Sequence, residues 1–280
     1  MNSTQDLTNM VRAVFEPDGL LSQANPHYRP RRGQIEMAEA VAQALNSPQP
    51  LVVEAGTGVG KTFAYLVPAL LSGMRVLVST ATKTLQDQLF GRDLPALVQA
   101  LGVPVQIALL KGRANYLCLH RLELARTEAL LPDRASVRAL SKVEQWAHGT
   151  RTGDLAEMPG LDERSALIPF ITSNRDNCLG SECGKYKECH LMAARREAMA
   201  AEVVVINHHL FFADLSVRES GMAELLPSVD AVIFDEAHQL NETGVHFLGQ
   251  HMGSAQWIDA ARDVLAAGLS HARGAADWPA

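Results

Sequence analysis

A glycine-rich segment carries residue types that bind nucleotide phosphates in many proteins. Residues 54–62 match the Walker A pattern, with Ala55 at the position of its first glycine. Glycines let successive backbone N–H groups converge on phosphate oxygens. We expect Lys61 to reach the β- and γ-phosphates of ATP and the Thr62 hydroxyl to bind Mg²⁺. The candidate phosphate-binding residues are Ala55, Gly56, Thr57, Gly58, Val59, Gly60, Lys61 and Thr62.

An acidic box, Asp235-Glu236-Ala237-His238, directly follows the apolar run 231–234. A strand that ends in carboxylates places them at the edge of an α/β sheet where ligands bind. We expect Asp235 to hold Mg²⁺ and Glu236 to orient and deprotonate the attacking water, as phosphoryl transfer requires. His238 is expected among the nucleotide-binding residues. A solvated helix start is the other interpretation of the box, and the upstream phosphate loop argues against it.

The chain contains only four cysteines, all between the phosphate loop and the acidic box: Cys118, Cys178, Cys183 and Cys189. Structural zinc sites usually contain close Cys-x2–4-Cys pairs, often with histidine, and only Cys178 and Cys183 approach that spacing. Four dispersed thiolates suit a [4Fe–4S] cluster equally well or better. Because His120 and His190 lie near cysteines and are also suitable zinc ligands, spacing alone leaves both metals open. Four inert, buried cysteines are a third interpretation.

The elements that must position these residues follow from hydrophobic periodicity. We expect strands at 51–53, 75–80, 105–110, 203–206 and 231–234, and helices at 29–45, 61–71 and 84–100. Apolar strands that alternate with helices indicate an α/β fold with a parallel sheet covered on both faces. A segment of different character, which holds all four cysteines, interrupts this pattern between the third and fourth of these expected strands. The first 25 residues show no strong periodicity and are expected to lead into the domain.

Composition suits a globular protein, with 280 residues, 47% hydrophobic and 20% charged. The apolar stretch 64–71 is broken by Pro68 and is too short to cross a bilayer. The N-terminal segment contains Asp6, Glu16 and Asp18 and no apolar run, so it does not match a secretory signal. We therefore expect a cytoplasmic protein without a membrane partner, in which clustered cysteines act as ligands rather than disulfides.

The net charge of −6 gives no global basic field for nucleic acid. Basic residues are nevertheless concentrated in residues 111–200, which hold 14 of the 25 Lys and Arg residues. This bias suits a surface that faces DNA. Ordinary solvated helix faces explain it at least as well, so charge alone does not decide between them.

Together these motifs resemble those of the XPD/DinG group of superfamily 2 helicases. The matching segments are residues 28–31 with Gln34, the phosphate loop, 79–89, 110–118, 207–210 and the acidic box. The resemblance implies a RecA-like P-loop motor domain with a parallel sheet, interrupted by a mainly helical four-cysteine Fe–S domain. It also implies that Gln34 reads adenine and that the four cysteines hold a [4Fe–4S] cluster.

By the same resemblance, the chain is expected to be part of an ATP-dependent DNA helicase with ATP, Mg²⁺ and the cluster as cofactors. Such a motor moves 5′ to 3′ on single-stranded DNA and separates forked duplex, in DNA repair or replication. The residues expected near the DNA backbone are Thr80, Thr82, Lys83 and Gln86. Their other interpretation is a Ser/Thr-rich strand end that caps the next helix. Replication or repair proteins are expected partners on this ground alone.

We expect residues 1–110 to begin motor domain 1, 111–200 to form the Fe–S domain, 201–240 to return to the motor domain, and 241–280 to start an arch region. Because the family continues into a second motor domain that supplies an arginine finger, the sequence is expected to be a fragment or truncated product with little activity alone. Two other functions stay open. One is a truncated, non-motor P-loop and metal module that binds DNA or a partner without efficient turnover. The other is a zinc-bearing P-loop ATPase, which residues 79–89 argue against.

Overall fold

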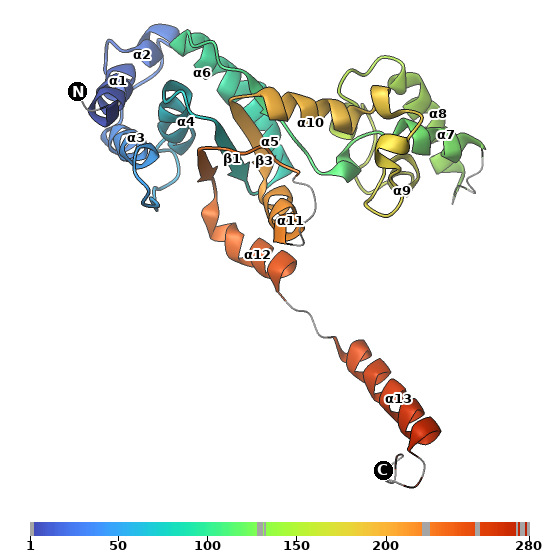
Figure 1. Cartoon of the computed structure of the whole chain (residues 1–280). Coiled ribbons are helices and arrows are strands. Elements are labelled where there is room, and N and C mark those ends of the chain that lie inside the picture. The colour runs from blue at the N-terminus through green and yellow to red at the C-terminus, as the bar shows by residue number, and fades with distance from the viewer. Residues whose placement is uncertain are drawn as a thin grey trace.

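The computed structural model of the protein describes residues 3–127, 131, 133–219, 225–249, 253–272, 274 and 278. At its centre lies a four-stranded parallel sheet with the order β2-β3-β1-β4 (Figure 1). The strands are β1 (Val76–Thr80), β2 (Ile107–Leu109), β3 (Val203–Asn207) and β4 (Ala231–Phe234). In the shared register, Val76 of β1 lies opposite Val203 of β3 and Ala231 of β4. The predicted α/β fold with a parallel sheet is confirmed.

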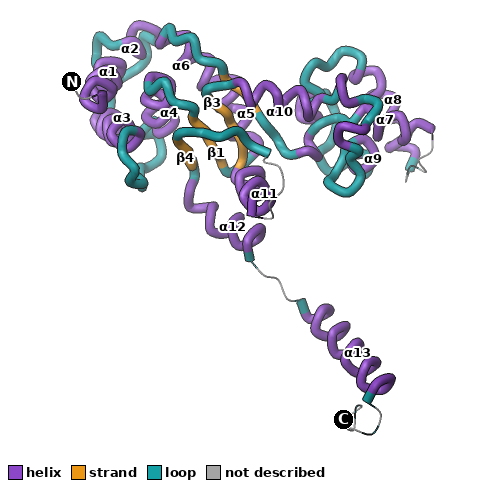
Figure 2. The backbone as a smooth tube through the Cα atoms, in the orientation of Figure 1, coloured by secondary structure: helices purple, strands orange, loops and turns teal. Residues whose placement is uncertain are grey.

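Helices precede, connect and follow these strands (Figures 1 and 2). They are α1 (Ser3–Phe15), α2 (Leu20–Ala24), α3 (Arg32–Leu45), α4 (Lys61–Leu71), α5 (Lys83–Gln88), α6 (Leu94–Leu101), α7 (Leu119–Thr127), α8 (Arg134–Ala147), α9 (Ile168–Ile171), α10 (His190–Ala200), α11 (His208–Glu219), α12 (Leu240–Leu248) and α13 (Ser254–His271). None of the described helices is long and apolar enough to span a membrane.

Both faces of the sheet are covered, because successive side chains of a strand point to opposite faces. Val76 and Val78 pack with α1, α3, α4 and α6 in one hydrophobic cluster. Leu77 faces the other way and packs with α10 and α11 in a second cluster. This two-sided burial explains why the central strands are almost continuously apolar.

The prediction for the first 25 residues was wrong, since they form α1 and α2 rather than an irregular lead. Helix α1 places Leu7, Val11, Val14 and Phe15 in the core cluster on the α3 and α4 side of the sheet. These positions follow the i, i+4, i+7, i+8 spacing of an amphipathic helix. The periodicity was therefore present in the sequence, in a segment whose polar residues obscured it.

The predicted strand at residues 51–53 is also wrong, because this segment forms no strand. Val52 is 93% exposed, and β4, with Val232 38% exposed, forms one edge of the described sheet. A strand is stabilised by hydrogen bonds to its neighbours and by burial of its side chains. A three-residue run can form few such hydrogen bonds, and its three side chains are exposed, so this segment does not form a strand.

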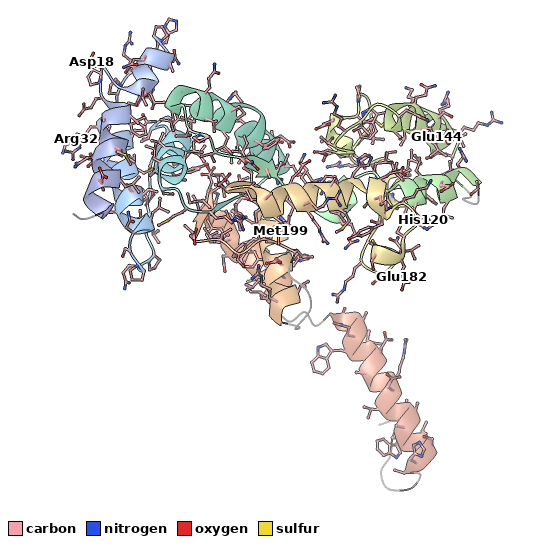
Figure 3. The ribbon with its side chains drawn as sticks, turned by 45° about the horizontal axis from the view of Figure 1, so that its top comes forward. Asp18, Arg32, His120, Glu144, Glu182 and Met199 are labelled. Atoms are coloured by element: carbon pink, nitrogen blue, oxygen red, sulfur yellow. The ribbon has the colours of Figure 1, made fainter. Side chains whose placement is uncertain are left out.

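The chain between β2 and β3 is mainly helical, as predicted, and has a hydrophobic cluster of its own. The fully buried members of that cluster include Val143, Leu167 and Ile171. Figure 3 shows His120, Glu144 and Glu182 on this helical unit and Met199 at the end of α10 that leads back to β3. The domain limits given above stay predictions, as does the start of an arch region at residues 241–280, where the structure has most of α12 and all of α13.

Candidate functional site

The phosphate loop leads directly into α4, whose first residue is Lys61. Gly58 and Gly60 have φ values of 79° and 89°, in the left-handed region that glycine adopts without steric cost. Nothing within 4 Å would contact a Cβ at Gly56 or Gly58, so the backbone there is open to a ligand. A loop of this kind at a helix N-terminus presents N–H groups and partial positive charge to an anion. The residues therefore fit a bound nucleotide phosphate.

Gln34 of α3 connects that helix to the phosphate loop through a hydrogen bond. Its Nε2 donates to the Gly60 carbonyl at 2.9 Å, and its Oε1 accepts from the Tyr28 hydroxyl at 3.0 Å. The side chain is buried, and a Cβ at Gly60 would collide with its amide. Gln34 thus lies beside the nucleotide site, where its contact to the loop is structural. Its reading of adenine stays a prediction.

The sheet brings the acidic box to the phosphate loop. The Asp235 N–H donates to the Ser79 carbonyl at 2.8 Å, which continues the pairing of β4 with β1. Lys61 Nζ donates to the Ala55 carbonyl at 3.2 Å and lies 3.9 Å from Glu236 Oε1. His238 is exposed, with Nδ1 3.4 Å from Glu236 Oε2. The predicted phosphate-binding lysine and the predicted general base therefore meet at one edge of the sheet.

Glu236 has a strained backbone. With φ 54° it is the only non-glycine residue at positive φ in the described part of the chain. For a residue with a Cβ this conformation costs on the order of 1–3 kcal/mol, and such strain gathers at functional sites. Here it turns the chain sharply at the end of β4 and directs the Glu236 carboxylate toward Lys61.

Tyr65, which sequence reasoning missed, lies behind the acidic box. It is 3% exposed, and both burial and the neighbouring Asp235 carboxylate raise the pKa of its hydroxyl. Burial, with the adjacent Glu236 charge, also raises the pKa of Asp235, whereas Tyr65 and Lys61 act to lower it. Tyr65 falls one helical turn after Lys61, so its place on an otherwise apolar helix face was a detectable signal.

A buried polar pair connects β1 to the start of α11. Ser79 Oγ and His208 Nδ1 lie 2.7 Å apart, and both residues are fully buried. Burial lowers the pKa of His208, while the backbone of Asp235 and Glu236 acts to raise it. The His208 ring also lies 6.0 Å from that of Phe234. His208 therefore packs between the end of β1 and the acidic box.

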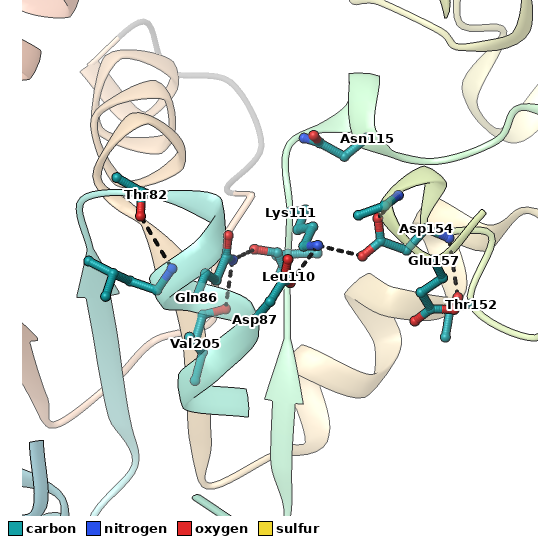
Figure 4. Close-up of polar contacts among 12 residues, drawn as sticks. Thr82, Gln86, Asp87, Leu110, Lys111, Asn115, Thr152, Asp154, Glu157 and Val205 are labelled. Carbon is teal, nitrogen blue, oxygen red and sulfur yellow. Dashed lines mark hydrogen bonds and ion pairs between the residues drawn. The ribbon is translucent and has the colours of Figure 1, made fainter. Parts of the chain in front are cut away.

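Two of the four residues predicted to contact DNA cannot do so from their positions here. Thr80 and Gln86 are fully buried, and Gln86 Nε2 donates to the Leu110 carbonyl at 2.9 Å (Figure 4). Thr82 Oγ1 accepts from the Leu85 N–H at 3.2 Å, which is the helix-capping role expected of a Ser/Thr-rich strand end. Only Thr82 and Lys83 are exposed, so we retain only these two as candidates for DNA contact.

Lys111, also missed, joins the sheet to the helical unit. Its Nζ lies 2.6 Å from Asp87 Oδ1 and 2.6 Å from Asp154 Oδ2, with the side chain 1% exposed (Figure 4). Burial by itself lowers the pKa of Lys111, and hydrogen bonds to Asp154 and Asp87 more than reverse this, so the net pKa is raised. The Lys111 N–H also donates to the Tyr116 hydroxyl at 3.0 Å.

All four cysteines line one cavity of about 140 Å³ in the helical unit, together with Arg113 and Arg195. Burial and the nearby Cys189 and Cys183 raise the pKa of Cys118. No three Cys, His, Asp or Glu side chains of the described residues converge closely enough to hold a single metal ion. The structure thus groups the predicted ligands around one cavity, without bringing their sulfur atoms to one point.

Comparison with known proteins supports the same picture. A family model described as DEAD/DEAH box helicase matches residues 35–131. The chain is 49% identical over 259 residues to the ATP-dependent DNA helicase YoaA of Haemophilus influenzae, covering 92% of this chain and 40% of that protein. It is 50% identical to YoaA of Escherichia coli (89% and 39% covered) and 40% identical to the ATP-dependent helicase DinG of Mycobacterium tuberculosis (84% and 38%).

The chain therefore spans about two fifths of the length of these curated relatives. Its similarity to them extends well beyond the phosphate loop, since it covers most of the chain, including the cysteine-bearing unit. The resemblance that the motifs indicate is confirmed: the chain carries a match to the DEAD/DEAH box helicase domain, and it is similar to the YoaA and DinG helicases over about two fifths of their length.

Proposed function

We propose that this chain provides the ATP-binding part of an ATP-dependent DNA helicase that moves 5′ to 3′ on single-stranded DNA and opens forked duplex. The observation that carries the proposal is the 3.9 Å approach of Lys61 to Glu236 at the edge of the sheet that also holds Asp235. This approach supplies a phosphate-binding cation and a general base in one place. The direction of movement and any replication or repair partners rest on the resemblance alone.

In this mechanism the loop backbone binds the β- and γ-phosphates, and Lys61 exchanges its contacts with Ala55 and Glu236 for phosphate oxygens. Thr62 and Asp235 would hold Mg²⁺, which when bound neutralises charge on the phosphates. Glu236, released from Lys61, orients a water molecule and accepts its proton. Because partial burial raises the pKa of Asp235, Lys61 and Tyr65 help to keep its carboxylate ionised.

The test compares wild type with Glu236→Gln, using ATP binding and ATP hydrolysis with and without single-stranded DNA. Loss of a general base lowers turnover by about 10²- to 10⁴-fold, whereas nucleotide binding should persist. Glu242→Gln, at an exposed position of α12, is the matched control. Near-normal turnover of Glu236→Gln refutes the assigned base. If wild type binds ATP and DNA without DNA-stimulated turnover, the chain is a binding module rather than a motor.

The polarity has its own assay. Two partial duplexes that differ only in carrying a 5′ or a 3′ single-stranded tail are offered to the protein with ATP. A 5′-to-3′ motor opens the substrate with the 5′ tail. Preference for the 3′ tail excludes the proposed direction and leaves the assignment of the ATP site untouched.

We also propose that the cysteine cavity holds a [4Fe–4S] cluster. A tetrahedral zinc site with Zn–S bonds of about 2.3 Å needs sulfur atoms about 3.8 Å apart. No such convergence exists among the described residues, and a larger centre bound by Cys118, Cys178, Cys183 and Cys189 suits the cavity better. Arg113 and Arg195 on the cavity wall offset the negative charge of four thiolates.

Iron, acid-labile sulfide and zinc are measured on protein purified without oxygen. About four iron and four sulfide per chain are expected for this centre. Zinc without sulfide refutes the cluster and favours a zinc-bearing ATPase or binding module. A Cys183→Ser variant should lose iron while keeping ATP binding, since the nucleotide residues lie at a different part of the fold.

A further inference from the structure

His208 is the first residue of α11 and packs against the acidic box. It is fully buried, and its Nδ1 lies 2.7 Å from the Ser79 Oγ near the end of β1. Within the described part of the chain, its other ring nitrogen, Nε2, is buried and has no hydrogen-bond partner. A buried polar atom without a partner is unfavourable, and in a native fold it requires a reason. No step of the proposed hydrolysis involves this side chain.

The backbone of the acidic box favours one protonation form of the ring. Burial lowers the pKa of His208, so the imidazole is neutral at neutral pH and carries a proton on one nitrogen only. The backbone of Asp235 and Glu236 acts in the opposite direction and raises this pKa. A backbone group with that effect is a carbonyl oxygen, which attracts a ring N–H. Because the Ser79 hydroxyl can donate to Nδ1, the ring proton can lie on Nε2.

Of the two carbonyls, that of Asp235 is the acceptor whose position matters to the site. The Glu236 carbonyl already accepts from the Gln239 N–H at 3.0 Å, and the Asp235 backbone raises the pKa of His208 more. The Asp235 carbonyl belongs to the peptide group that joins Asp235 to Glu236. Rotation of this group about the N–Cα bond of Glu236 is the φ angle, which has the strained value of 54°. A hydrogen bond to its oxygen therefore holds both the strained turn and the direction of the Glu236 carboxylate.

The first turn of α11 is fixed well enough to place the imidazole. Asn207 Oδ1 accepts from the Leu210 N–H at 2.9 Å, which caps the helix. The Phe211 and Phe234 rings meet edge to face with centroids 4.8 Å apart, and the His208 ring lies 6.0 Å from the same Phe234 ring. Because Phe234 is the last residue of β4, directly before the acidic box, the start of α11 and the box are packed together (Figure 1).

We propose that His208 is the positioning residue of the general base: in the nucleotide-bound site its Nε2 donates to the Asp235 carbonyl and fixes the turn that carries Glu236. In the structure, Lys61 lies 3.9 Å from the Glu236 carboxylate and supports the same turn. When Lys61 binds phosphate instead, the turn loses that contact and the hydrogen bond from His208 replaces it. His208 acts through the backbone and not on ATP itself. This inference rests on the proposed function, because it needs Glu236 to act as the base.

Two substitutions separate the roles of the two ring nitrogens. The amide of asparagine reaches the place of Nδ1, whereas the amide of glutamine reaches the place of Nε2. His208→Asn should therefore lower ATP turnover about tenfold, the fold-change that corresponds to one hydrogen bond. His208→Gln should retain most of the turnover that His208→Asn loses. The dissociation constant for ATP should be unchanged in both, because the phosphate loop is untouched.

His209→Asn is the matched control, because His209 is the next residue, is exposed, and lies with its ring against Phe247 rather than against the acidic box. Circular dichroism checks that each variant is folded. In a Glu236→Gln background, His208→Asn should lower turnover no further, since no base is left to position. Equal losses in His208→Asn and His208→Gln, or a further loss in the Glu236→Gln background, refute the positioning role.

Nuclear magnetic resonance of the wild-type protein observes the hydrogen bond itself. With isotopically labelled histidine, the spectrum shows which nitrogen of each ring carries the proton, and the signal missing from His208→Asn identifies His208. Addition of Mg²⁺ and a non-hydrolysable ATP analogue should shift the Nε2 proton downfield and slow its exchange with water. A proton on Nδ1, or an Nε2 proton that bound nucleotide does not change, overturns the inference even when wild type hydrolyses ATP.

The two proposals fail in different ways. If wild type binds the analogue and does not hydrolyse ATP, the proposed function fails, whereas the resonance of the Nε2 proton still decides whether the hydrogen bond forms. If wild type does not bind the analogue, both proposals fail.

Discussion

Lys111→Met is the substitution whose effect on stability the structure specifies best. It removes the ammonium group between Asp87 and Asp154 and keeps the length of the aliphatic side chain. The Asp154 side chain is 6% exposed, so its carboxylate is left buried with its ion-pair partner gone. Removing one partner of a buried pair costs about 3–5 kcal/mol. The Asp87 side chain is 44% exposed, so water screens that pair and it adds at most about 1 kcal/mol.

We expect the lower part of that range, about 3 kcal/mol, because Asp154 Oδ1 still accepts from the Ala156 N–H at 3.0 Å. Asp87→Asn is the matched variant on the exposed side and should cost about 1 kcal/mol or less. The double variant Lys111→Met/Asp154→Asn should recover much of the loss, since no unpaired charge stays buried. Urea unfolding followed by circular dichroism measures the free energies.

The reasoning is refuted if Lys111→Met costs less than about 1 kcal/mol, or if the double variant is no more stable than the single one. The pH dependence provides a further check. Because the pKa of Lys111 is raised above its usual value, its contribution to stability is fully present at neutral pH. It is lost only as the pH rises through that raised pKa, so acidification to pH 6 should leave the Lys111→Met difference unchanged.

Two further outcomes follow from the candidate ATP site. Gly60→Ala should abolish ATP binding in an equilibrium titration, because φ is 89° and the new Cβ meets the Gln34 amide. Burial lowers the pKa of His208, so stability should fall as the pH drops below about 6.5, where the unfolded chain takes up the proton; urea unfolding of wild type and His208→Gln at two pH values measures this.

The geometry of the candidate nucleotide site was predictable because its signals are local. Glycines at positive φ, a lysine at the first position of a helix and carboxylates after an apolar run are each encoded within a few residues. The order of strands adds only that the end of β4 lies near the loop, which an α/β fold makes expected. Two local predictions failed: the helices of the first 25 residues were missed, and the strand at 51–53 does not form, since a short apolar run is stabilised as a strand only by neighbours that bury it.

The Lys111 bridge was not predictable, because its partners lie 24 and 43 residues away and neither spacing is periodic. Gln86 and Thr80 are a second example of positions that sequence alone did not predict correctly. Both are polar residues in a segment that resembles a DNA-contacting motif, yet tertiary packing buries them, and Gln86 bonds to the backbone that follows β2. Burial of a polar side chain depends on the whole fold, so a single motif does not determine it.

The segment from Lys111 to Cys118 contributes to the walls of two cavities. Gly112 and Asn115 line a cavity beside the ends of β1, β2 and β3, which Lys83 also lines, whereas Arg113 and Cys118 line the cysteine cavity. A 3-10 turn at Arg113–Asn115 separates them, and the Cys118 N–H donates to the Ile171 carbonyl at 2.9 Å, which fixes the far end. Both cavity walls therefore contain residues of this one segment.

The candidate ATP residues belong to the loop before α4 and to the end of β4, so none of them lies in the segment 111–118. Cys118→Ser should accordingly weaken binding of single-stranded DNA more than binding of ATP, and titrations of the same preparation with both ligands measure the ratio. An equal loss of both affinities would mean that the substitution acts by general unfolding. A loss confined to ATP would contradict this expectation, because residues 111–118 share a cavity wall with Lys83, a candidate for DNA contact, and not with the phosphate loop.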